Sequence, residues 1–243
     1  MSQAISLETS ERLSAGVEEL SVFRDGVRPG WSREVFSEPY RASRDWTAAR
    51  MCEVGLEVTV DSAGNIVGRL AGRNSSAPAL VTGSHTDTVD GGGRFDGIVG
   101  VLGSIEAARL VQESGTQLQR DLLVVDFLGE ESNVFGLSCL GSRSAAQEMT
   151  REDLDRQDYR GVTLGQAYSD FGLDPSMLAE VPWASARCTP SSNCTSNRAR
   201  PSRSTGCRSA SSRPSPASSA SSPRSPAPRI MRGRRRWMTA GTR

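Results

Sequence analysis

Residues 79–85 read ALVTGSH, residues 97–114 read GIVGVLGSIEAARLVQES, and residues 121–129 read DLLVVDFLG. The first and third segments are short apolar runs, which are typical of buried strands. The second carries apolar residues at helical spacing and is predicted to form an amphipathic helix. Strand, helix and strand in this order predict a βαβ unit, and therefore an α/β fold with a parallel-rich sheet.

The flanking segments extend the α/β prediction in both directions. Apolar spacing predicts helices over residues 7–24, 41–55, 139–149 and 151–157. Residues 55–72 alternate apolar and polar positions around a central Ala-Gly-Asn, a pattern that predicts a β-hairpin.

Polar side chains follow each strand of the predicted βαβ unit. His85 ends the first strand, Asp87 lies two residues further, and Glu130 and Glu131 follow the second strand. Asp96 precedes the helix, after glycines that allow the backbone to turn sharply. Open α/β sheets place ligand sites at the carboxyl ends of their strands, so these side chains should converge on one edge. Histidine is a common metal ligand, and the Asp87 carboxylate can hydrogen-bond its second ring nitrogen and fix its tautomer.

Each of these residues has a simpler interpretation when it is considered alone. His85 could be a surface or hydrogen-bonded histidine, Asp96 a helix cap, and Glu130 with Glu131 a solvated pair. The glycines at 91–93 could form a flexible turn, and they do not match either phosphate-binding glycine motif. The combination, with each member at the end of its own element, favours a shared site.

Three stretches carry a resemblance to a known family. Residues 83–107 (GSHTDTVDGGGRFDGIVGVLGSIEA) and 126–143 (DFLGEESNVFGLSCLGSR) closely resemble the M20-type zinc amidohydrolases, and residues 55–72 match the start of the same domain. The nearest branch is that of N-carbamoyl-L-amino-acid hydrolases, allantoate amidohydrolases and β-ureidopropionases. The resemblance covers about residues 10–180, with its motifs in the family's order.

The resemblance implies a role for each candidate residue. His85 would bind one metal ion, Glu131 a second, and Asp96 would bridge the two. Asp87 would orient His85, and Glu130 would be the general base that takes a proton from the attacking water. A free carboxylate beside an activated water suits that task.

The resemblance also implies cofactors, substrates and assembly. Two divalent metal ions are expected, zinc or manganese, and the ligand types also suit cobalt or nickel. The implied activity is hydrolysis of linear C–N bonds in small carbamoyl or ureido compounds, such as N-carbamoyl-L-amino acids or allantoate. The implied fold is a zinc-peptidase-like catalytic domain, truncated here, without the lid and dimerisation domain through which the family forms homodimers. Substrate-binding residues are unknown, and Val134 replaces an Arg that the family usually has after the paired Glu.

The net charge of +1 is the sum over two segments of opposite charge. Residues 181–243 contain no Asp or Glu but 13 of the 29 basic residues, all Arg, together with 15 Ser and 8 Pro. Such a composition cannot bury enough apolar surface to offset its ordering entropy and predicts disorder. We therefore expect a catalytic-domain portion over residues 1–183 and a disordered Ser/Arg/Pro-rich segment over residues 184–243.

The chain has one histidine, whereas the family's site needs further histidines in motifs such as LHIEQGP and DHAGATPM. Read one base earlier, codons for residues 193–200 can encode LHIEQGP, and those for residues 226–242 can encode a segment containing DHAGATPM. Residues 205–212 can likewise give GLPIGVV. Our hypothesis is that the chain after about residue 183 is an out-of-frame translation, which the gene sequence would test.

Two other interpretations stay open. The chain could be an inactive truncated fragment, or, less favoured, a basic-tail protein that binds nucleic acid or an acidic partner. The polar, acid-containing start does not resemble a signal peptide, and no apolar run approaches the roughly 20 residues of a membrane span. We expect a cytoplasmic protein that does not enter membranes.

Overall fold

The computed structural model describes residues 7–178 and residue 180, all within one compact unit of the chain. The segment 184–243, its predicted disorder and its proposed out-of-frame origin lie outside the described residues. Among the described helices, none is long and apolar enough to cross a membrane.

The elements follow the order that the sequence predicts. The strands are β1 (Glu57–Val60), β2 (Ile66–Leu70), β3 (Leu80–His85) and β4 (Leu122–Phe127). The helices are α1 (Leu7–Leu20), α2 (Glu38–Glu53), α3 (Ile98–Glu113), α4 (Leu140–Ala145), α5 (Arg151–Leu154), α6 (Leu164–Asp170) and the 3₁₀ turn η1 (Pro175–Met177). The predicted hairpin, the βαβ unit and the predicted helices are confirmed, whereas α6 and η1 were not predicted.

The described sheet is mixed, so the prediction of a parallel-rich sheet is wrong for this part of the chain. The strand order is β1-β2-β4-β3, and only β3 and β4 are parallel, with His85 opposite Phe127. β2 pairs with β1 and with β4, both antiparallel. The βαβ crossover supplies the parallel pair of the described sheet, and the hairpin adds β2 beside β4 in the opposite direction, with β1 at the edge.

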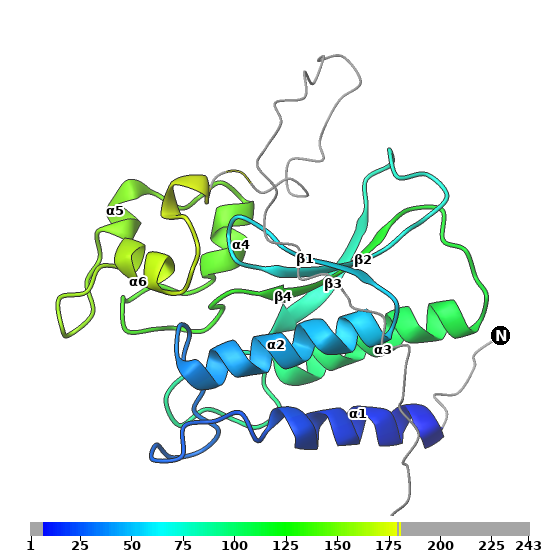
Figure 1. Cartoon of the computed structure of the whole chain (residues 1–243), viewed down its shortest axis with the longest axis horizontal. Helices are drawn as coiled ribbons and strands as arrows, with labels where there is room; N and C mark the ends of the chain where they lie inside the picture. The colour runs from blue at the N-terminus through cyan, green and yellow to red at the C-terminus, as the bar shows by residue number, and fades with distance from the viewer. Residues whose placement is uncertain (1–6, 179, 181–243) are drawn as a thin grey trace, which may run out of the picture. The chain divides into compact units, whose positions relative to one another are not determined.

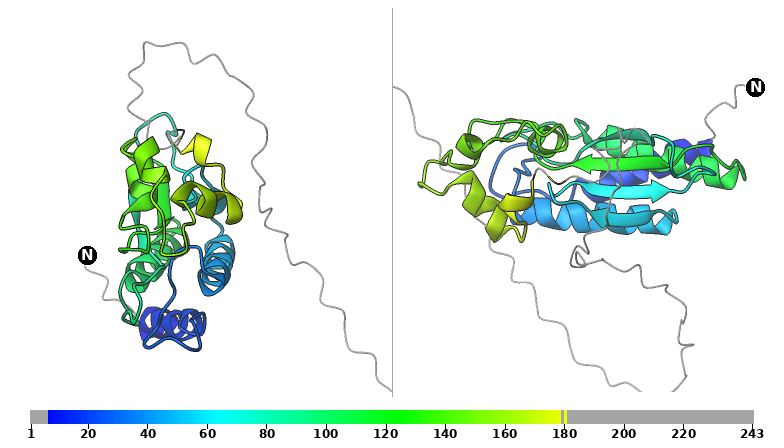
Figure 2. Two further views of the ribbon diagram at one scale, coloured as in Figure 1. Left: turned by 90° about the vertical axis from the view of Figure 1, so that its left-hand side faces the viewer. Right: turned by 90° about the horizontal axis from the view of Figure 1, so that it is seen from above.

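Helices cover one face of this sheet in two layers (Figures 1 and 2). α3 packs on β3 and β4, α2 packs on β1 and β2, and α1 lies beyond them against α3. The core between the sheet and these helices includes Met51, Ile66, Val101 and Val124. Burying each such side chain contributes about 1.5–3 kcal/mol, which holds α3 firmly on the two parallel strands.

A second core forms where α4, α5 and α6 gather at one end of the sheet. Leu128, Leu140, Leu164 and Tyr168 are fully buried there. Short helices of this kind depend on packing and caps, and Thr150 supplies a capping box to α5. This cluster fixes the chain just after β4, where the paired glutamates lie.

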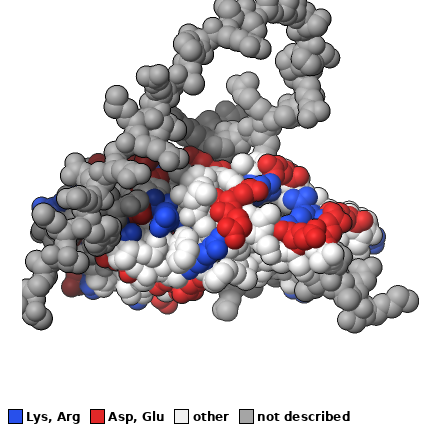
Figure 3. Space-filling model, turned by 90° about the horizontal axis from the view of Figure 1, so that it is seen from below, with Lys and Arg blue, Asp and Glu red and all other residues white. Residues whose placement is uncertain are grey.

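Ion pairs attach α1 to the neighbouring helices. Arg12 contacts Glu106 of α3, and Arg50 of α2 contacts Glu19. On the face seen in Figure 3, acidic side chains accordingly lie beside basic ones rather than apart from them. Helix α3, whose first turn follows Asp96, is therefore packed against β3 and β4 and ion-paired with α1.

Candidate metal centre

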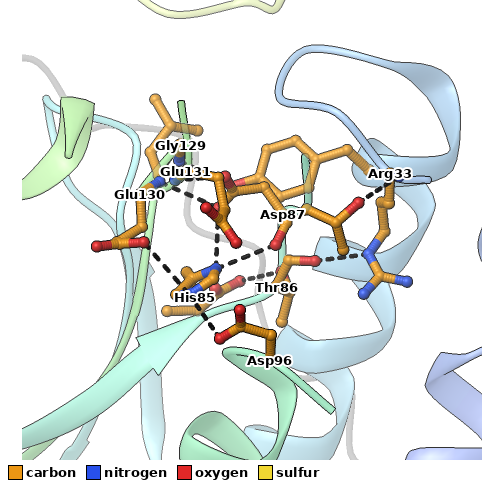
Figure 4. A network of polar contacts seen from close by, with 12 residues as sticks. Arg33, His85, Thr86, Asp87, Asp96, Gly129, Glu130 and Glu131 are labelled. Carbon is orange, nitrogen blue, oxygen red and sulfur yellow. Dashed lines mark hydrogen bonds and ion pairs between the residues drawn. The ribbon is translucent and has the colours of Figure 1, made fainter. Parts of the chain in front are cut away.

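The five predicted site residues come together at one edge of the sheet (Figure 4). His85 is the last residue of β3, and Glu130 and Glu131 follow β4 after a turn at Gly129. Because β3 and β4 are parallel neighbours, their carboxyl ends meet there. Asp96 lies at the same edge, because it directly precedes Gly97, the N-cap of α3.

His85, Asp96 and Glu131 form a cluster that could hold a metal ion. Each offers one ligand atom, and these atoms all lie within 4.8 Å of one another. One imidazole and two carboxylates form a donor set that suits zinc, manganese, cobalt or nickel. The residues that the sequence predicts as metal ligands are therefore brought together, and they fit a divalent cation.

The His85 ring is held so that Nε2 faces the carboxylates. Its Nδ1 lies 3.0 Å from the main-chain carbonyl oxygen of Asp87. A carbonyl can only accept, so Nδ1 carries the proton and donates it there. On the other side of the ring, Nε2 lies 3.4 Å from Glu130 Oε2 and 4.0 Å from Asp96 Oδ1 and is the ring nitrogen that faces the candidate metal site.

The Asp87 side chain acts differently from the sequence-based expectation. Its nearest carboxylate oxygen lies 3.6 Å from His85 Nδ1, beyond the carbonyl contact. Instead, the main-chain N–H groups of Glu130 and Glu131 donate to its two oxygens, at 3.1 and 3.0 Å. The residues after β4 no longer pair with a neighbouring strand, so these N–H groups need another acceptor, and the Asp87 carboxylate supplies it. Asp87 thus orients His85 through its carbonyl and the glutamates through its carboxylate.

Glu130 has a further contact that the sequence analysis did not single out. The Cys139 thiol donates to Glu130 Oε1 at 3.5 Å, and the Cys139 N–H donates to the Glu130 carbonyl at 2.8 Å. Cys139 adopts a left-handed backbone conformation, with φ of 58°, which is uncommon for a residue other than glycine. No local sequence signal marks this contact, because it depends on how α4 folds back onto the chain after β4.

Acidic groups dominate the electrostatics of the site. Burial raises the pKa of the Glu131 carboxyl, and the nearby carboxylates of Asp96, Asp87 and Glu130 raise it further, while His85 opposes them. Burial is also the main cause that raises the pKa of Asp87. A bound cation would relieve this repulsion, which is a second reason why the residues fit a metal ion.

Gly97 leaves room for the His85 ring. Its φ is 67°, and a Cβ there would lie 2.4 Å from the His85 carbonyl oxygen and 2.6 Å from Nδ1. A side chain at this position would collide with both the strand end and the imidazole. Gly97 is therefore part of the site because it leaves space for the imidazole, although its residue type supplies no ligand atom.

Comparisons with known proteins show which family the chain resembles. The sequence pattern of the family described as "Peptidase family M28" matches residues 65–164. The ureidoglycolate hydrolase of Oryza sativa subsp. japonica is 36% identical over 71% of this chain and 36% of its own length. The N-carbamoyl-L-amino acid amidohydrolase of Geobacillus stearothermophilus is 36% identical over 70% of this chain and 42% of its own length.

A solved structure supports the same relationship. The amidase of the hydantoinase/carbamoylase family from Burkholderia vietnamiensis superposes with a TM-score of 0.64 at 32% sequence identity. The match covers 71% of this chain and 42% of that one. The chain thus spans about two fifths of the length of the relatives that it matches.

Proposed function

Because the chain belongs to the amidohydrolase family of the N-carbamoyl-L-amino-acid amidohydrolases, allantoate amidohydrolases and ureidoglycolate hydrolases, we propose that its described residues form half of such a hydrolytic site. The reaction is hydrolysis of a linear C–N bond in a small carbamoyl or ureido compound. The observation that carries this proposal is the convergence of His85, Asp96 and Glu131, whose ligand atoms lie within 4.8 Å of one another.

The proposed ligands divide between two divalent ions, zinc or manganese. His85 would hold one ion and Glu131 the other, with Asp96 between them. When bound, such a pair lowers the pKa of water and polarises a carbonyl group. The described residues supply one imidazole and two carboxylates toward this set, so the remaining ligands must come from elsewhere in the active protein.

Glu130 is the proposed general base. Its carboxylate stands beside the ligand cluster, with Oε2 3.4 Å from His85 Nε2, and is partly exposed, so water can reach it. It would accept a proton from the attacking water and return it to the leaving nitrogen. Asp87 would keep both glutamates in place through the two N–H groups that donate to its carboxylate.

We further propose that the chain as written is incomplete as a catalyst. It has a single histidine, His85, and two ions of this kind need more ligands than the described residues supply. An out-of-frame origin of residues 184–243 would account for the missing motifs. The second candidate, an inactive fragment, is favoured by the same single histidine.

The test compares two proteins. One is the present chain, and the other carries the one-base-earlier reading frame of its gene from about residue 184 onward. With zinc or manganese added, we expect ammonia release from N-carbamoyl-L-amino acids, allantoate or ureidoglycolate only by the second protein. No turnover by that protein with two ions bound would refute the proposed function. Activity and two ions per chain in the first would refute its incompleteness.

Replacing the proposed base gives a sharper prediction. Glu130→Gln in the restored protein should lower kcat by about 10²–10⁴-fold, because the amide cannot accept the proton. Metal content should stay unchanged, since the substitution leaves His85, Asp96 and Glu131 in place. Glu148→Gln, on the exposed segment after α4, is the matched control and should leave kcat unaltered.

A further inference from the structure

Arg33 is an unusual feature beside the candidate metal centre. It lies outside any helix or strand, and its side chain is fully buried. Burial lowers the pKa of its guanidinium to about 10, with the charge of Asp126 acting in the opposite direction, so the group stays charged at neutral pH. A buried charge is costly unless it is well partnered, so its contacts indicate what it does for the fold.

The guanidinium of Arg33 binds main-chain carbonyl groups from two parts of the chain. Nε donates to Thr86 at 2.6 Å, and Nη1 donates to Phe23 at 2.8 Å and to Leu20 at 3.3 Å. Its main chain also pairs with Thr88. The Arg33 N–H donates to Thr88 Oγ1 at 2.8 Å, and the Thr88 N–H donates to the Arg33 carbonyl at 3.0 Å.

These contacts hold the segment that orients His85. Thr86 lies between His85 and Asp87. Arg33 holds the Thr86 carbonyl, and the Thr86 hydroxyl donates to Asp126 at 3.0 Å. The next carbonyl, that of Asp87, accepts from His85 Nδ1. A rotation of the 86–88 main chain would therefore remove the acceptor that keeps Nε2 directed at the carboxylates. Partners of this indirect kind commonly change metal affinity by about 10–100-fold when they are lost.

We propose that Arg33 is a positioning residue for the candidate metal centre. It clamps residues 86–88 from both ends, and so holds the His85 ring in the orientation and tautomer that leave Nε2 free for a metal ion. The inference rests on the proposed function for its link to metal binding, but the ring orientation can be observed without a metal.

Two substitutions isolate the contact to Thr86. In Arg33→Gln the amide nitrogen takes the place of Nε, whereas in Arg33→Met a methyl group takes that place. Both lose the charge and the contacts to Leu20 and Phe23. If the Thr86 contact positions His85, the glutamine variant should resemble the wild type more closely than the methionine variant does.

The readouts are the His85 ring and the zinc affinity. Because His85 is the only histidine, its ring ¹⁵N signals can be assigned without ambiguity. In metal-free wild type in mildly alkaline buffer we expect one tautomer, protonated at Nδ1. Arg33→Met should give a mixture of tautomers and bind Zn²⁺ about 10–100-fold more weakly, and Arg33→Gln should be less affected. Arg69→Met is the control, since it removes an arginine that is ion-paired at the opposite end of β4.

The outcomes separate the inference from the proposed function. A folded Arg33→Met variant with wild-type ring signals and zinc affinity would overturn the positioning role. If wild type binds no Zn²⁺ but the tautomer changes as expected, the positioning role stands, and metal binding then requires the ligands that the present chain lacks; the proposed function itself is tested on the protein with the restored reading frame. Should Arg33→Met not fold, Thr88→Val removes the acceptor of the Arg33 N–H instead. The same tautomer mixture is then expected, and unchanged signals would overturn the role.

Discussion

At the scale of single residues, main-chain groups orient the side chains that we propose as metal ligands and base. His85 donates to a carbonyl, and Glu130 and Glu131 are held by their own N–H groups against the Asp87 carboxylate. A folded main chain has less conformational freedom than a long side chain. The candidate ligand atoms are therefore held in place as firmly as the main chain that orients them. Small changes in backbone position at this edge should therefore affect metal binding more than their effect on stability suggests.

Gly97→Ala tests that expectation. The new Cβ would lie within 2.6 Å of the His85 ring and carbonyl, and the φ of 67° is strained for alanine, so the β3 end must shift. We expect a stability loss of about 1–3 kcal/mol and a fall in zinc affinity of at least about tenfold. Chemical denaturation and zinc titration measure the two effects.

Gly103→Ala, within the helix α3 that Gly97 caps, is the matched control. A Cβ there meets no atom within 4 Å, so helix propensity should make this variant equal to or more stable than wild type by up to about 1 kcal/mol. If Gly97→Ala binds zinc as tightly as Gly103→Ala does, the close approach of Gly97 to His85 has no part in metal binding.

At the scale of elements, one buried side chain joins the hairpin to the chain after β4. Asn65 precedes β2 and is fully buried. Its Oδ1 accepts from the Leu128 N–H at 3.0 Å, and its Nδ2 donates to Gly141 at 3.3 Å and to Asp61 at 2.9 Å. It therefore sets the position of the turn from which Glu130 and Glu131 project.

Asn65→Ala should destabilise the protein by about 2–4 kcal/mol, because it removes these hydrogen bonds and leaves the buried Leu128 N–H without an acceptor. The free energy of unfolding from urea denaturation measures it. Asn74→Ala provides the comparison, because Asn74 is exposed and, within the part of the chain that the structure describes, its side chain accepts a hydrogen bond only from the N–H of Ser76. Equal losses in the two variants would contradict the joining role of Asn65.

The elements also show which features the sequence could predict. β3, α3 and β4 carry strong local patterns, and the site residues lie at or next to their ends, so these elements and the site residues were predictable. The antiparallel addition of β2 to β4 was not, because strand pairing depends on tertiary register rather than on local pattern. α6 follows the capping residue Thr163, but its seven residues are too few for a clear periodicity. No sequence pattern marks Arg33, because only the folded chain shows what its side chain contacts.

At the scale of the whole molecule, a buried charged pair lies where α2 meets the sheet. Asp126 of β4 is fully buried, accepts from Thr86 and faces Arg44 of α2 at 3.6 Å. Within the described residues, its Oδ1 has no hydrogen-bond partner. Burial raises the pKa of Asp126 to about 6, although Arg44 opposes the shift. This carboxyl links the stability of the entire unit to pH.

The direction of that dependence follows from proton linkage. The unfolded chain releases the Asp126 proton near its ordinary pKa of about 4, whereas the folded protein keeps it until about pH 6. Between these values the folded state binds more protons, so the contribution of Asp126 to stability falls as pH rises. The fall is on the order of 1.4 kcal/mol for each unit of pKa shift.

Asp126→Asn should remove this slope. The substitution also removes the carboxylate that faces Arg44. The test is therefore the difference in stability between variant and wild type across pH 4–6, measured on metal-free protein by urea denaturation. We expect that difference to shift in favour of the variant as pH rises. Asp153→Asn should shift the opposite way at lower pH, because hydrogen bonds from Thr150 hold the pKa of Asp153 below its ordinary value. A constant difference between Asp126→Asn and wild type would mean that Asp126 is ionised throughout this range, with Arg44 outweighing its burial.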